Sequence, residues 1–272
     1  MRQAWAVTDS AALQYATEQQ NLRTELVRLA RHAGQPNLQW ACAAEGNVSG
    51  RWLADRMVVK ASGCSMERLE SSDLVDVARG PLLALLDQAA ADDVAVDQVY
   101  RTAMSGGVDE QRTDRRPSVE ALLHAVILDR TDAAFVLHAH PIAVNQLLCS
   151  SAADLLVAGA LFPDQIVMMG QHQLLIPYVD PGLELARAVR LGMDEFAQTY
   201  LRTPKVIYLR NHGVFVMARD VQDAIDTMSM TVKVAAVLLG AIAAGGPVYL
   251  DELQGVRIET RPDEHYRRTM LR

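Results

Sequence analysis

The chain has 272 residues, 50% of them hydrophobic, with a mass of 29.8 kDa and a mean hydropathy of +0.04. These values exclude a disordered or fibrous chain and predict one soluble globular domain over residues 1–272. The formal net charge of −7 argues against a broad attraction to nucleic acid or to an anionic membrane. We therefore expect neither as a partner, and we expect any anionic ligand to be held by a local site.

In chain order, the residue pattern predicts helices and short strands that alternate without a regular strand–helix–strand period. A single α/β domain with a mixed or antiparallel sheet, covered by helices, is therefore favoured over a purely parallel sheet. The predicted elements are a helix at 17–32, strands at 40–43, 56–60 and 69–77, a surface excursion at 87–116, a helix at 117–129, a strand at 133–138, a helix at 142–149, strands at 166–169 and 174–177, a helix at 180–192, strands at 206–210 and 214–217, and a helix at 221–244 that Asp220 caps.

The cysteines and the apolar segments indicate a cytoplasmic protein. Cys42, Cys64 and Cys149 are an odd number without metal-type spacing, and they make no disulfide framework in a chain of this length. Acidic residues and glutamines interrupt the first 20 residues, unlike the apolar block of a secretory signal. The longest apolar stretch, 234–244, is about half the roughly 20 residues that a membrane span needs, so we expect a buried or subunit-contact helix there.

The clearest chemical signal is a pair of histidines, His138 and His140, at the end of a predicted hydrophobic strand. Strand residues two apart face the same side, so both imidazoles point at one place, as a first-row metal ion requires. The alternative is that one or both are core histidines. His212 lies before Gly213 at another predicted strand end. If it reaches the pair, three imidazoles with one open position make a catalytic metal site.

Glu120 and His124 lie four residues apart and share one face of the predicted helix. If that face meets the metal, Glu120 can act as acid or base, its pKa raised by burial and lowered by the cation. The alternative is a solvent-facing glutamate that favours the helix N-terminus. We interpret His124 as a packing or orienting residue and not as a ligand.

Two glycine-bearing turns, at 46–49 and 61–63, could offer backbone N–H groups, an amide and hydroxyls to a phosphate. Neither has the dinucleotide-binding or P-loop pattern, and both could be ordinary hairpin turns. Lys60 could supply a positive charge or, less favoured, a Schiff-base amine.

Five segments occur in series: Gly46-Asn47-Val48-Ser49, Lys60-Ala61-Ser62-Gly63, Pro117-Ser118-Val119-Glu120 with His124, His138-Ala139-His140-Pro141 and Asn211-His212-Gly213. Together they resemble the class II aldolase/adducin family, over about residues 38–246. The second, third and fourth segments look most like the aldolase half of the fused rhamnulose-1-phosphate aldolase/alcohol dehydrogenases, and the dehydrogenase half has no counterpart here.

The resemblance implies a three-layer α/β/α domain with a mixed, mainly antiparallel sheet, and a cyclic homotetramer with active sites between subunits. It implies a catalytic carboxylate at Glu120, and a zinc ion, with manganese or cobalt as alternatives. Sugar-phosphate aldolases of the family often have two serines before the glutamate, whereas Val119 takes the second place here. The implied metal ligands are His138, His140 and His212, and the implied phosphate site consists of Gly46, Asn47, Ser62, Gly63 and Ser118.

These residues suit a metal-dependent aldolase that cleaves a ketose phosphate or a related sugar acid through a metal-stabilised enediolate, with Glu120 as acid/base. The second acid/base would be a tyrosine, which the sequence does not single out. A decarboxylase or dehydratase would use the same chemistry. The further alternatives are a metal-free, adducin-like binding module, against which the retained histidines and glutamate argue, and a Schiff-base aldolase at Lys60.

Overall fold

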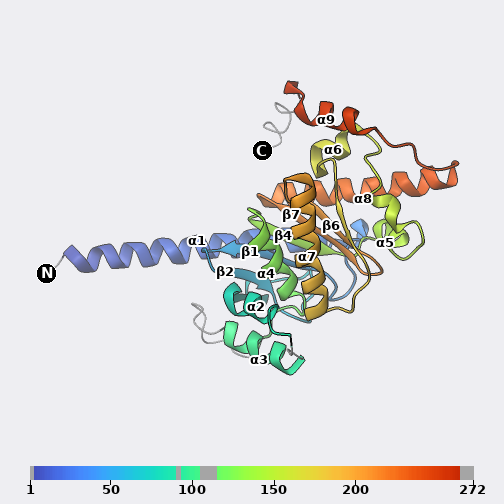
Figure 1. Ribbon diagram of the computed structural model, residues 1–272. Helices are drawn as coiled ribbons and strands as arrows, with labels where there is room; N and C mark the ends of the chain where they lie inside the picture. The colour runs from blue at the N-terminus through green and yellow to red at the C-terminus, as the bar shows by residue number, and fades with distance from the viewer. Residues whose placement is uncertain (1–2, 90–92, 105–114, 264–272) are drawn as a thin grey trace.

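The computed structural model describes residues 3–89, 93–104 and 115–263, and a seven-stranded sheet forms the middle layer of this part (Figure 1). The strand order is β3-β2-β1-β4-β7-β6-β5, with β5 and β6 parallel and every other neighbouring pair antiparallel. The predicted mixed, mainly antiparallel sheet is confirmed. The strands are β1 (Asn47–Trp52), β2 (Arg56–Lys60), β3 (Leu74–Ala78), β4 (Phe135–Ala139), β5 (Leu174–Ile176), β6 (Val206–Leu209) and β7 (Gly213–Ala218).

Helices cover both faces of the sheet (Figure 1). One apolar cluster joins α1, α5 and α8 to the first face, and a second cluster joins α2, α4 and α7 to the other. This arrangement gives the three α/β/α layers. The helices are α1 (Gln3–Ala33), α2 (Arg79–Leu85), α3 (Asp93–Ala103), α4 (Ala121–Arg130), α5 (Ile142–Leu148), α6 (Pro163–Met169), α7 (Leu183–Tyr200), α8 (Val221–Ala243) and α9 (Glu252–Thr260).

Successive side chains along the central strands belong alternately to these two apolar clusters. In β4, Leu137 belongs to the cluster beneath α1 and α8, whereas Val136 belongs to the cluster beneath α4 and α7. In β7, Val216 and Phe215 divide in the same way. Since successive strand side chains point to opposite faces, His138 lies on the same face as Val136 and Phe215. Its ring stacks on Phe215 with centroids 4.1 Å apart.

The prediction of a strand at 40–43 is wrong, because that segment is an irregular loop and the strand begins at Asn47. Gly50 lies inside β1. A Cβ there would lie 2.5 Å from Leu22 Cδ1 and 3.5 Å from Leu26 Cδ1. The glycine therefore allows α1 to pack closely on the strand.

The predicted strand at 166–169 is also wrong, because these residues end α6. Pro163 occupies the first turn of α6, where its missing N–H costs nothing. The helix predicted to end at 192 continues to Tyr200. Gly192 does not end the helix but allows it to pack closely on β5, where a Cβ would lie 2.6 Å from Ile176 Cδ1. Asp220 caps α8 as predicted, with its Oδ1 accepting a hydrogen bond from the Asp223 backbone N–H at 2.8 Å.

The segment 87–116, expected to be an irregular surface excursion, contains helix α3, and residues 90–92 and 105–114 lie outside the described part. The helix expected from 117 begins instead at Ala121. Pro117 lies outside the helix and forms an isolated antiparallel bridge with Ala61. This bridge places the turn after β2 beside the entry to α4.

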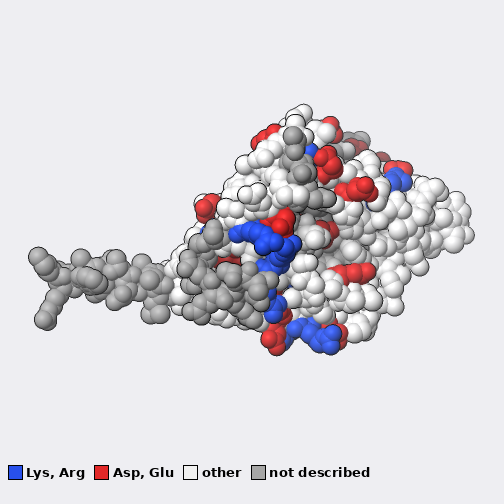
Figure 2. Space-filling view, turned by 90° about the horizontal axis from the view of Figure 1, so that it is seen from below, with Lys and Arg blue, Asp and Glu red and all other residues white. Residues whose placement is uncertain are grey.

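Among the described residues, α8 alone has the length and apolar composition of a membrane span, a test that core helices also pass. Its buried side packs in the core through residues such as Met228 and Val234. Its second half, which projects at the right of Figure 1, exposes Val237 and Ile242, and residues 234–250 contain no charged side chain. Figure 2 shows that projecting end as an uncharged surface.

Candidate metal centre

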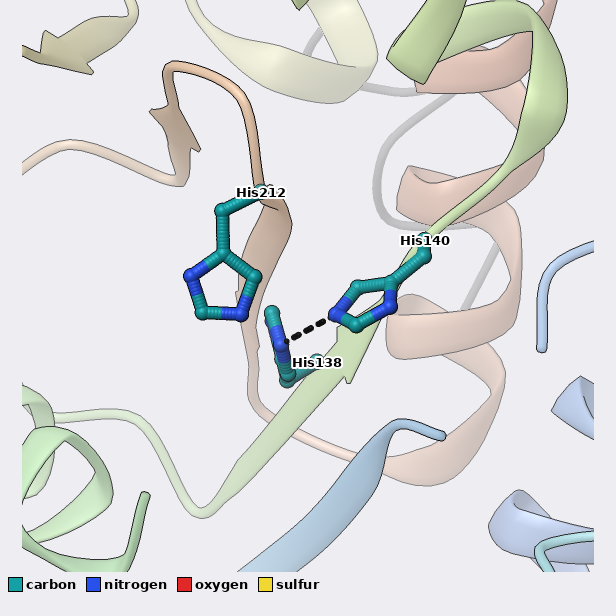
Figure 3. A group of neighbouring side chains, drawn as sticks. All are labelled: His138, His140 and His212. Carbon is teal, nitrogen blue, oxygen red and sulfur yellow. Dashed lines mark hydrogen bonds between the residues drawn. The ribbon is translucent and has the colours of Figure 1, made fainter. Parts of the chain in front are cut away.

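Three imidazoles from two separate segments meet at one end of the sheet. His138 lies near the end of β4, His140 follows that strand, and His212 lies in the turn between β6 and β7. The β4–β7 register pairs Ala139 with Val214, so the turn that holds His212 lies beside the end of β4. Figure 3 shows the three rings pointing toward one another. Their candidate ligand nitrogens all lie within 4.8 Å of one another.

The ring of His138 is held in the orientation that a ligand needs. Its Nδ1 donates a hydrogen bond to the Val214 carbonyl at 3.1 Å, so its Nε2 carries the free lone pair. That Nε2 lies 2.9 Å from Nε2 of His140. Burial, together with the nearby His138, lowers the pKa of His140 to about 3. The His140 imidazole is therefore neutral near pH 7, the state in which it binds metal.

Glu120, just before the first residue of α4, places its carboxylate against this cluster. Its Oε1 lies 3.2 Å from His138 Nε2 and 2.9 Å from His212 Nε2, and its Oε2 accepts a 2.6 Å hydrogen bond from Asn47 Nδ2. Burial opposes ionisation of this carboxyl, but His138 and His212 outweigh it and hold the pKa well below the usual range. Glu120 is thus ionised near pH 7.

These residues fit a divalent cation. Zinc lies about 2.0–2.1 Å from imidazole nitrogens, so its tetrahedral ligands are roughly 3–3.5 Å apart. Here the His138 and His140 nitrogens are 2.9 Å apart, and all three ligand nitrogens lie within 4.8 Å of one another. Glu120 Oε1 is buried and has no hydrogen-bond partner among the described residues. Such an atom is costly unless a proton or cation satisfies it. A cation between the three rings would have this oxygen beside it.

Two glycines allow the backbone to approach the histidines closely. A Cβ on Gly213 would lie 2.4 Å from His140 Cδ2 and 2.7 Å from the Ala139 carbonyl. A Cβ on Gly46, whose φ is +70°, would lie 2.8 Å from the His138 carbonyl. Asn145 adds a hydrogen bond from Nδ2 to the His212 carbonyl at 3.0 Å. Nothing in the local sequence singles out Asn145 for this role.

Gly213→Ala is expected to weaken metal binding about 10–100-fold, the usual cost of disturbing the surroundings of a metal ligand. The added methyl group would overlap the His140 ring and displace it. Isothermal titration with zinc measures the effect. Gly240→Ala is the matched control, because it adds the same methyl group in α8 with no atom within 4 Å. Equal zinc affinity in the two variants would contradict the prediction.

The candidate phosphate residues form two groups. Asn47 and Ser118 are buried beside Glu120, and the Asn47 amide donates to Ser118 Oγ at 2.9 Å. Ser62 and Gly63 lie on an exposed turn that the Ala61–Pro117 bridge holds against the entry to α4. The Ser62 backbone N–H already donates to the Arg116 carbonyl at 2.9 Å. The Ser62 hydroxyl and the Gly63 N–H are therefore the groups on this turn that could meet a phosphate.

Lys60 is buried, and its ammonium donates to the Cys64 carbonyl at 2.6 Å and to the Ala44 and Ala61 carbonyls at 3.4 Å. Burial lowers its pKa, against the charges of Cys64 and Glu120, which raise it. These three carbonyls hold the lysine as a structural cation beneath the 61–64 turn. Its contacts thus argue against a Schiff-base role.

Residues 24–239 match the model of the Class II Aldolase and Adducin N-terminal domain family. The chain belongs to this family. This class II aldolase-family chain is 26% identical over 188 residues to a methylthioribulose-1-phosphate dehydratase of Acidiphilium cryptum, covering 67% of this chain and 74% of that protein. The match to a known enzyme family supports an enzymatic role.

Solved structures share the fold of this class II aldolase-family chain. A class II aldolase domain from Thermoplasma acidophilum aligns with a TM-score of 0.60 and 22% identity, covering 79% of this chain and 92% of that domain. The L-fuculose-1-phosphate aldolase of Thermus thermophilus aligns with a TM-score of 0.57 and 20% identity, covering 84% and 98%. These comparisons confirm the predicted fold.

Proposed function

We propose that this protein is a metal-dependent lyase that breaks a carbon–carbon bond next to the carbonyl of a ketose phosphate or a related sugar acid. The observation that carries the proposal is the position of Glu120 Oε1, buried, without a hydrogen-bond partner, and beside the nitrogens of His138 and His212. The three histidines would hold zinc, with manganese or cobalt as alternatives. The cation supplies Lewis-acid stabilisation of the negative charge that develops on the substrate oxygen.

The protein's own residues move the proton. When the bond between the α carbon and the carbinol carbon breaks, the electron pair stays on the α carbon, conjugated with the carbonyl. In the synthetic direction the Glu120 carboxylate removes a proton from that carbon with Oε1. In the cleavage direction Glu120 must first be protonated at Oε1, and it then gives that proton to the carbon. Asn47 holds Oε2 throughout. The carbinol hydroxyl passes its proton to a separate acid/base and leaves as the aldehyde.

A dehydratase is the second candidate, and the relatives support it. Two methylthioribulose-1-phosphate dehydratases are each 26% identical to this chain, that of Acidiphilium cryptum over 188 residues and that of Geobacillus kaustophilus over 157 residues. In that reaction Glu120 would take the proton from the α carbon, and the hydroxyl of the next carbon would take a proton from an acid group and leave as water. Glu120 exchanges the proton of the α carbon in both reactions, giving it in the cleavage and removing it in the dehydration.

A zinc-supplemented screen of ketose 1-phosphates and unphosphorylated sugar acids, read by product mass, separates these candidates. An aldolase gives two fragments, whereas a dehydratase gives one product about 18 Da lighter. We expect turnover of one class of substrate, and we expect it to disappear with a chelator and to return with the metal. A metal-free protein without activity toward either class would instead support a binding module.

Inorganic phosphate is expected to compete with the substrate, because the turn at Ser62 and Gly63 and the Ser118 hydroxyl offer donors to an anion. Ser62→Ala is expected to raise the inhibition constant of phosphate about 10-fold or more, since a hydrogen bond to a charged group contributes about 1.5–3 kcal/mol. Ser229→Ala, on the exposed side of α8, is the control. Absence of competition would contradict a phosphate site on this turn.

We further propose a cytoplasmic homotetramer. The family resemblance supports the assembly, and the uncharged surface of α8 offers a contact face. The odd number of cysteines, all three of them free, supports a reducing compartment. Light scattering of the purified protein measures the assembly directly.

A further inference from the structure

His124 is the one fully buried histidine outside the triad among the described residues, and both of its ring nitrogens are occupied. Nδ1 lies 2.6 Å from Ser49 Oγ, and Nε2 forms a short hydrogen bond with Asn47 Oδ1. The ring also packs edge-on against Phe215. Because its exposed fraction is 0%, no bulk water competes for either nitrogen.

The contacts of Asn47 determine the direction of each hydrogen bond. Its Nδ2 lies 2.6 Å from Glu120 Oε2 and 2.9 Å from Ser118 Oγ, so both amide protons have acceptors. A flipped amide would place Oδ1 against the carboxylate, with two acceptors facing each other. Oδ1 must therefore face His124, whose Nε2 must carry the proton. Nδ1 then has a lone pair and accepts from the Ser49 hydroxyl.

We propose that Ser49, His124 and Asn47 form a positioning network that holds Glu120 by Oε2 and leaves Oε1 as the only oxygen that exchanges a proton with the substrate. His124 acts through Asn47 and does not touch the substrate. This inference rests on the proposed role of Glu120 as acid/base. It also gives Asn47 a role other than phosphate binding, because both protons and the oxygen of its amide are already engaged.

Two substitutions separate the two ends of the imidazole. His124→Gln keeps an amide N–H near the position of Nε2 and so preserves the bond to Asn47. His124→Asn keeps a polar group near Nδ1 and loses that bond. We expect His124→Asn to lower kcat about 10–100-fold with KM and zinc content unchanged, and His124→Gln to stay within about threefold of the unsubstituted protein. Equal losses in both variants, or a raised KM with normal kcat, would overturn the proposal.

The ring proton is measured without any substrate. In protein labelled with ¹⁵N-histidine, long-range ¹H–¹⁵N spectra, assigned with the His124→Gln variant, show which nitrogen of His124 is protonated. We expect the Nε2–H tautomer in both zinc-loaded and metal-free protein, and an Nδ1–H tautomer would overturn the network. Crystal structures of the two variants are the second test. We expect the Asn47 side chain to be rotated away from Glu120 in His124→Asn and to keep its position in His124→Gln. The spectra and the crystal structures test the hydrogen-bond network without any lyase activity. A failure of the network can therefore be distinguished from a failure of the proposed function.

Discussion

His138→Ala is expected to abolish stoichiometric metal binding and with it all turnover. The substitution removes a ligand whose ring is fixed by the Val214 carbonyl and by Phe215. The loss of affinity should exceed the roughly 10–100-fold that disturbing a ligand's surroundings costs. Elemental analysis of the purified protein measures the metal, and thermal unfolding measures the stabilisation by added zinc, which should disappear.

Because His138 is fully buried, its removal also leaves a cavity in the core. His212→Ala separates the two effects, since the His212 side chain is 15% exposed and its loss disturbs the packing less. The same loss of zinc is expected in this variant. His172→Ala is the control, because it removes an imidazole that stacks on Tyr200 outside the cluster. Retention of one zinc per chain in His138→Ala would contradict the assignment.

Glu120→Gln is expected to keep the metal and to lower kcat by about 10²–10⁴-fold, the usual contribution of a general acid or base. The amide keeps the size of the side chain but takes no proton at the position of Oε1. Its oxygen can still accept from Asn47, so the fold around the site is preserved. Steady-state kinetics on the substrate found in the screen measures the effect, with zinc content determined in parallel.

Glu259→Gln is the matched control, because it neutralises a carboxylate whose partner is Arg202 at the surface. Such a pair contributes little to stability, and it lies outside the proposed site. Turnover in Glu120→Gln at the rate of this control would remove the acid/base assignment and leave Glu120 as a structural residue.

Part of the histidine cluster could be predicted from local rules in the sequence. Two residues apart on a strand, His138 and His140 face one side, and a glycine after His212 predicts a turn at a strand end. The β4–β7 register that brings these segments together is a long-range pairing. No local pattern determines such a pairing, so only the family resemblance connected His212 to the pair.

The wrong strand prediction at 166–169 has a physical cause, because short apolar runs do not distinguish helix from strand. Residues 166–169 are as apolar as a buried strand, but Pro163 begins a helix that includes them. The glycine within β1 is explained only by the close packing of Leu22 against Gly50. The positioning network could not be predicted either, since Ser49 and His124 are 75 residues apart and meet through packing.

The central claim is that three imidazoles hold one cation beside Glu120, and anomalous diffraction from crystals grown with zinc tests it most directly. We predict a single strong peak about 2.0–2.1 Å from a ring nitrogen of each of His138, His140 and His212. Absence of a peak between these rings in zinc-saturated crystals, or a peak bound by only one of them, would contradict the account.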